Sequence, residues 1–121
     1  MSKPNREAYR ASQITIDLDN PTGMRILSTW FNMQSIGAVD GRISASGKGI
    51  HIRCTSPEPL TLSEVLLIRQ QHADDTQRIH YDMTAPESKP LMILFDRKRG
   101  MCADDWLSDP IRLIDRYGAK I

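Results

Sequence analysis

Hydrophobic and polar residues alternate over residues 13–19, where Ile14, Ile16 and Leu18 share one side of the chain and polar side chains share the other. A period of two residues is typical of a β-strand with one buried face. Pro21 then interrupts the alternation, because proline lacks the backbone N–H that a strand would need. The pattern therefore predicts a first strand that ends just before this proline.

Apolar residues next recur every three or four positions over residues 22–36, which is the period of an amphipathic helix. Thr22 can act as the N-cap, because its hydroxyl can accept a hydrogen bond from the first helical turn, and Gly37 marks the end. This helix is expected to carry Ile26, Leu27, Trp30, Phe31 and Met33 on its apolar side.

A hairpin is predicted after the first helix. Two short strand-like runs, 41–46 and 50–55, are separated by the tripeptide Gly47-Lys48-Gly49, whose glycines favour a tight turn. The second run alternates again. Its predicted inward residues are Ile50, Ile52 and Cys54, and its predicted outward residues are His51, Arg53 and Thr55.

The second half of the chain predicts two more helices and two more strands. In the run 78–82, Ile79 and Tyr81 would point inward and the polar residues outward, which is the alternation of a strand. The elements expected here are a helix from Thr61 or Ser63 to about residue 73, a strand over 78–82, an added strand over 91–96, and a last helix from Asp109-Pro110 to Tyr117.

The order of these elements predicts an α+β fold. Strand, helix, strand, strand, helix, strand is the order of the ferredoxin-like or RNA-recognition-motif (RRM-like) fold, an antiparallel four-stranded sheet with both helices on one face. The first strand would lie at the centre, between the strands that carry His51 and Asp82. Residues 1–12 are polar without a period and are expected to be a flexible lead-in, so that residues 13–121 form one domain.

Composition narrows the possible functions. The 16 Lys and Arg residues nearly balance the 15 Asp and Glu residues, so no global basic field indicates a nucleic-acid partner and any such binding would be local. Cys54 and Cys102 fit neither a disulfide framework nor a zinc-ligand spacing. The apolar stretches are far shorter than the roughly 20 residues of a membrane helix, and the first residues lack a signal-peptide pattern. We expect a cytoplasmic protein without a membrane partner.

The predicted sheet would gather carboxylates on its open face. Asp17 and Asp19 lie at outward positions where the first strand ends, and Asp82 ends the predicted fourth strand. Three carboxylates this close would repel one another unless a cation lay among them. Mg²⁺ or Mn²⁺ suits such ligands and leaves positions for phosphate and water. The tripeptide Gly47-Lys48-Gly49, beside His51, would offer backbone amides and a cation to a triphosphate.

The chain contains Asp17-Leu18-Asp19, then the sequence SGKGIH over residues 46–51, then an aspartate after an apolar residue. In this order they resemble the three motifs of the archaeo-eukaryotic primase superfamily, which includes primase small subunits and primase-polymerases. The resemblance covers about residues 13–96. Asp96 is the alternative candidate for the aspartate of the third motif. Asp82 is preferred because it closes a strand predicted beside the first, whereas Asp96 would share its face with Met92 and Leu94.

The resemblance implies a minimal or divergent member that carries out metal-dependent nucleotidyl transfer in DNA replication. Asp17, Asp19 and Asp82 would be catalytic and would bind Mg²⁺ or Mn²⁺. The nucleotide would be bound by Ser46, Lys48, His51 and Arg53. The implied partners are nucleoside triphosphates, single-stranded or primed DNA or RNA, and other replication proteins.

Two other functions stay open. An RRM-like binding module would stack bases on aromatic residues of its central strands, but the outward positions here hold Asp17, Asp19, His51 and Arg53. A replication-accessory subunit would instead dock its open sheet or last helix on another protein. Ordinary structural interpretations also exist: the aspartates as a solvated strand end, and the glycine tripeptide as a plain hairpin turn. Manganese-dependent nucleotide binding separates the primase-like function from the other two.

Overall fold

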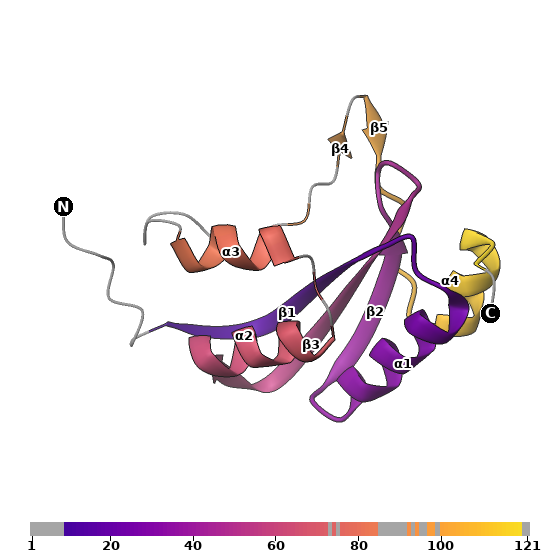
Figure 1. Cartoon of the computed structure of the whole chain (residues 1–121). Coiled ribbons are helices and arrows are strands. Elements are labelled where there is room, and N and C mark those ends of the chain that lie inside the picture. Colours follow the sequence, from indigo (N-terminus) through magenta and orange to yellow (C-terminus); the bar gives the residue numbers. More distant parts are fainter. Residues whose placement is uncertain are drawn as a thin grey trace.

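The structure, a computed structural model, describes residues 9–72, 74, 76–84, 92, 94, 97–98 and 100–119. The strands of its larger sheet stand in the order β1-β3-β2, and β4 and β5 form a separate hairpin that projects from the sheet (Figure 1). The chain is therefore an α+β protein, as predicted. Its elements are β1 (Arg10–Asp19), α1 (Gly23–Gln34), β2 (Ala38–Ile43), β3 (Gly49–Thr61), α2 (Leu62–Gln71), α3 (Thr76–Thr84), β4 (Arg97–Lys98), β5 (Met101–Cys102) and α4 (Pro110–Tyr117).

The central strand of the sheet is β3, which pairs antiparallel with both neighbours. Asp17 of β1 and Arg42 of β2 both lie opposite His51. Because residues that pair directly share a face of an antiparallel sheet, these three side chains lie on the same side. The other face carries the alternating apolar residues, such as Ile16 and Ile52, which are fully buried. The predicted first strand is confirmed, and so is the hairpin, although its first strand covers residues 38–43 rather than the predicted 41–46.

Three helices, α1, α2 and α4, contribute buried residues to the core on the apolar face of the sheet. The predicted cap of α1 is confirmed, because Thr22 Oγ1 accepts from the N–H of Arg25 at 3.2 Å. Trp30 of α1 and Leu113 of α4 are fully buried. Gly41 of β2 leaves them room, since a Cβ there would lie 2.7 Å from Leu113 and 2.9 Å from Trp30. Phe31, predicted to be on the apolar side of α1, is instead 57% exposed.

The two later helices begin where the sequence predicts. Thr61 is the N-cap of α2, because its Oγ1 accepts from Glu64 N at 3.2 Å while the Glu64 carboxylate accepts from Thr61 N at 3.0 Å. Asp109 caps α4, and Gly118 ends it with a left-handed φ of 73°. Within the described ranges, no helix is long and apolar enough to cross a membrane.

The fourth strand of the prediction is wrong, because residues 78–82 lie in α3. Ile79 is 8% exposed and Tyr81 is 71% exposed, so these two residues do not share a buried face. Five alternating residues are too few to distinguish a strand from one and a half turns of helix. As a consequence β1 is an edge strand of the described sheet rather than its centre.

The structure differs from the predicted bounds at the start of β1 and after β5. Residues 10–12, predicted to belong to a flexible lead-in, are part of β1, and Arg10 pairs with Thr61. Most of the strand predicted over 91–96, with Asp96, lies outside the described residues. The segment 104–107 instead extends the sheet beyond β2. Gly41 and Leu107 exchange backbone hydrogen bonds of 2.9 and 2.7 Å, and Asp104 N donates to Ile43 O at 3.0 Å.

Candidate functional site

Asp17 and His51 face each other across the β1–β3 pair. The distance from His51 Nε2 to Asp17 Oδ1 is 3.8 Å, and the histidine side chain is 6% exposed while that of Asp17 is 35% exposed. His51 Nδ1 accepts from Arg42 Nε at 3.0 Å. This hydrogen bond assigns the proton of a neutral ring to Nε2, on the side of Asp17. Asp17 and His51, predicted to be neighbours, thus lie in a chain that runs from the guanidinium of Arg42, which was not predicted, through the imidazole to a partly exposed carboxylate.

The turn between β2 and β3 lies beside the end of β1. Asn20 N donates to Lys48 O at 2.9 Å, and Asp19 pairs with Gly49. Gly47 adopts a φ of 74°, the left-handed region that glycine enters without strain. The first and second predicted motifs are therefore brought together at one end of the sheet.

The amides of this turn are not a phosphate cradle, contrary to the sequence-based expectation. Gly47 N donates to Ser44 O at 2.9 Å and Gly49 N donates to Ser44 Oγ at 3.1 Å. Lys48 N donates to Ser46 Oγ at 3.3 Å. The turn uses its own amides to hold its shape. The side chains of Lys48 and Ser46, both exposed, are what it presents to a ligand.

Tyr117 of α4 contacts the site, although the sequence identified it only as the end of the last predicted helix. Its hydroxyl donates to Lys48 O at 2.9 Å, so the last helix holds the turn in place. Burial, and then the negative charge of Asp19, raise the pKa of this hydroxyl above its ordinary value. Tyr117 therefore stays a neutral donor at physiological pH.

A cavity of about 760 Å³ opens at the end of β1. Arg25 brings a cation to its wall, and its Nη2 donates to His72 O at 2.7 Å. The volume lies within the range of small-molecule sites. Asn20, which lines the cavity, is also the residue whose N–H donates to Lys48 O of the turn. Its lining comprises residues 17–22, Arg25, Gln70, Asp74 and Ile79.

Arg53 lies on the same face but is already engaged. It forms two hydrogen bonds to Asp40, Nε to Oδ1 at 2.9 Å and Nη2 to Oδ2 at 2.5 Å. Its guanidinium carbon also lies 3.9 Å from the ring centre of Trp106, and that of Arg42 lies 4.4 Å from the same ring. Trp106 was not anticipated on this face, since it comes from the irregular segment that follows β5.

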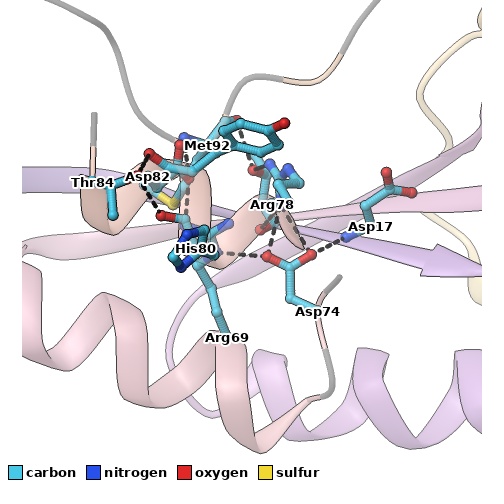
Figure 2. Close-up of polar contacts among 10 residues, drawn as sticks. Asp17, Arg69, Asp74, Arg78, His80, Asp82, Thr84 and Met92 are labelled. Atoms are coloured by element: carbon cyan, nitrogen blue, oxygen red, sulfur yellow. Dashed lines mark hydrogen bonds and ion pairs between the residues drawn. The ribbon is translucent and has the colours of Figure 1, made fainter. Parts of the chain in front are cut away.

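Asp82 is not brought together with Asp17 and Asp19. Its Oδ2 accepts from Arg69 Nη1 at 2.6 Å and from Met92 N at 3.0 Å (Figure 2). Within the described part of the chain, no group of three or more His, Cys, Asp or Glu side chains is arranged to hold a metal ion. A cation shared by the three predicted carboxylates therefore does not fit this geometry. Asp17 and Asp19 remain as the acidic residues at the strand end.

Asp74, an acidic residue outside the predicted site, contacts β1 at Asp17. Asp74 Oδ1 accepts from the backbone N–H of Asp17 at 2.8 Å, and the Asp74 side chain is fully buried. The sequence analysis gave Asp74 no role, because a single buried aspartate outside a periodic run leaves no signal in the hydrophobic pattern.

No family model, curated protein or solved structure matches this chain in the comparisons made with each of them.

Proposed function

We propose that the chain binds a nucleoside triphosphate, as its Mg²⁺ or Mn²⁺ complex, at the end of the β1–β3 pair. The observation that carries this proposal is the adjacency of two short motifs: Asp17 lies 3.8 Å from His51, and the backbone of Asn20 is bonded to Lys48. Carboxylate oxygens of Asp17 and Asp19 suit the hard cation, and the exposed ammonium of Lys48 suits the phosphates. The divalent ion arrives with the nucleotide and needs no third protein carboxylate.

The fold supports a distant relationship to primase-polymerases. In an RRM-like sheet the strand order places a fourth strand beside the first, with the third strand on its other side. Here the order β1-β3-β2, with α1 and α2 between the strands in sequence, matches the first five elements of that arrangement. We infer an RRM-like core in which the α2–α3 region takes the position of the fourth strand.

Nucleotidyl transfer in replication is the activity that this binding would serve. A primer 3′-hydroxyl would attack the α-phosphorus, and the bond to the leaving pyrophosphate would break. With two carboxylates at the site, the chain would act either as a minimal transferase or as a nucleotide-binding accessory subunit. An extension assay with manganese, labelled nucleotide and a primed single strand separates these two roles, because only the transferase incorporates label.

Calorimetry tests the binding itself. The wild type, at millimolar Mn²⁺ and nucleotide, should show heat of binding, and Asp19→Asn should bind about tenfold more weakly, because a ligand oxygen with full negative charge is lost. Asp105→Asn, at an exposed aspartate outside the site, should bind like the wild type. Absence of any nucleotide binding by the wild type, or equal affinity in Asp19→Asn, would overturn the proposal.

One observation favours nucleic-acid binding as a second candidate function. Trp106 brings an aromatic ring to the polar face of the sheet, where the guanidinium groups of Arg42 and Arg53 both contact it. Aromatic and guanidinium groups are the surfaces on which single-stranded bases stack. Metal-independent binding of a single-stranded oligonucleotide that is lost in Trp106→Ala would support this function and not the first.

A further inference from the structure

The outer edge of β1 is bonded by side chains at the place where another strand would pair. Asp17 N donates to Asp74 Oδ1 at 2.8 Å (Figure 2). Thr15 O accepts from Arg78 Nη1 at 2.9 Å. An edge strand presents an outward N–H and an outward carbonyl at alternate residues. Asp74 and Arg78 therefore supply one acceptor and one donor of the kind that a neighbouring strand would have supplied.

Each carboxylate oxygen of Asp74 accepts at least two hydrogen bonds. Its Oδ2 accepts from Arg69 Nε at 2.6 Å and from Arg78 Nη1 at 2.8 Å, and its Oδ1 accepts from Arg78 at 3.0 Å in addition to Asp17 N. The side chains of Asp74 and Arg69 are 0% and 1% exposed. A buried carboxylate with two cationic partners is compensated in charge and has little freedom to move.

The backbone also fixes this position. Asp74 N donates to Arg69 O at 2.9 Å, just after α2, and Arg78 of α3 follows Asp74 by four residues. The second carboxylate on Arg69 comes from Asp82, with which Nη1 makes its 2.6 Å contact. Arg69 thus joins the carboxylates of Asp74 and Asp82, and Asp74 and Arg78 connect this cluster to Asp17 and Thr15 of β1.

We propose that Asp74 is a positioning residue for the nucleotide site, because it fixes the β1 backbone at the residue whose carboxylate faces His51. This inference rests on the proposed function. The N–H of Asp17 is bonded to Asp74, and its carboxylate lies 3.8 Å from His51 Nε2. Asp74 also lines the cavity. Without the bond to Asp74, the end of β1 would sample several positions. Only some of these would place the carboxylates of Asp17 and Asp19 against the metal–nucleotide complex.

The test compares Asp74→Asn with a control that lowers stability without contacting this edge. Asp74→Asn keeps the shape but sets an amide NH₂ against two guanidinium donors or against Asp17 N. Thr61→Ala removes the N-cap of α2 at the opposite end of that helix. Manganese–nucleotide affinity is measured by calorimetry well below both melting temperatures. The exchange rate of the Asp17 amide hydrogen is measured by NMR.

If Asp74 positions the site, Asp74→Asn should bind the metal–nucleotide complex about tenfold more weakly and exchange its Asp17 amide faster, while Thr61→Ala stays within about twofold of the wild type in affinity. Arg78→Lys keeps the charge but loses the bidentate geometry, and it provides a milder variant if Asp74→Asn does not fold. Wild-type affinity in the folded Asp74 or Arg78 variant would overturn the positioning role alone. A wild type that binds no nucleotide would overturn the proposed function and this role together.

Discussion

Cys54 and Cys102 have different surroundings, although both are free thiols. Cys54 is fully buried and its Sγ donates to Met33 O at 3.3 Å, whereas Cys102 is exposed. Burial, followed by the charge of Asp40 and opposed by a hydrogen bond with the backbone of Gly37, raises the pKa of Cys54 to about 11. Because the thiolate is the reactive form, Cys54 should be inert at neutral pH.

A labelling experiment checks this difference. At about pH 8 a thiol reagent should modify the native protein once, at Cys102, and should modify Cys54 only after unfolding in denaturant. Mass spectrometry counts the labels. Cys102→Ala should take up no label while folded. A native protein that is labelled twice would contradict the expectation.

His72 should make stability depend on pH near neutrality. Burial, and then the positive charge of Arg25, lower the pKa of its imidazole below the ordinary value of 6.5. The unfolded chain therefore binds a proton at a higher pH than the folded chain does. The contribution of neutral His72 to stability is fully present above the unfolded pKa and is lost as the pH falls through the folded pKa.

Urea unfolding measures this effect. The midpoint of the wild type should fall between about pH 7.5 and pH 5.5, and it should fall less in His72→Gln, which cannot be protonated. Carboxylates that titrate at lower pH are present in both proteins and provide an internal reference. Parallel pH profiles for the two proteins would show that His72 does not contribute.

At the scale of elements, the β1–β3 pair and its turn could be predicted because their signals are local. A period of two residues needs only neighbours in sequence, and Gly47 has the left-handed φ of 74° that a tight turn requires. The placement of Asp17 opposite His51 follows from these two facts. The helix α3 could not be predicted in this way. Its conformation is fixed by distant partners, since Arg78 reaches Thr15 and Asp82 reaches Arg69.

The connection from α1 to β2 depends on Gly37 because the chain passes very close to β3. A Cβ at this residue would lie 1.9 Å from Thr55 O, which is backbone and cannot turn away. Gly37→Ala should therefore destabilise the fold by about 3 kcal/mol or more. At Gly47 a Cβ would meet nothing within 4 Å, so Gly47→Ala should cost only the left-handed backbone, about 1 kcal/mol. Urea unfolding of both variants checks the order, and a larger loss in Gly47→Ala would contradict it.

At the scale of the whole molecule, the site is assembled from segments far apart in sequence. Lys48 is held by Tyr117, Arg53 is covered by Trp106, and Asp17 is held by Asp74. None of these pairs is marked by spacing or by a motif, because each contact exists only once the last helix and the α2–α3 junction have packed. The sequence could place the acidic pair and the glycine turn, but not the residues that hold them.

The same long-range packing predicts that the sheet and the last helix unfold together. Trp30 is fully buried, and Gly41 of β2 lies against both its ring and Leu113 of α4. The segment 104–107, which leads into α4, is bonded to β2 by Gly41 and Ile43. Separating α4 would therefore expose Trp30 and Leu113 and also break the backbone hydrogen bonds between the segment 104–107 and β2. Such coupling favours a single cooperative transition.

The two tryptophans of the chain make this cooperativity measurable. In Trp106→Phe the remaining fluorescence comes from Trp30, at the contact between the sheet, α1 and α4. Its urea transition should coincide with the loss of far-ultraviolet circular dichroism, which reports all helices and strands. Leu113→Ala should move both transitions together to lower urea, because the cavity costs about 2–5 kcal/mol of the one shared stability. A Trp30 signal that changes at lower urea than the circular dichroism would show that α4 detaches before the sheet unfolds, and that the turn held by Tyr117 can be released without global unfolding.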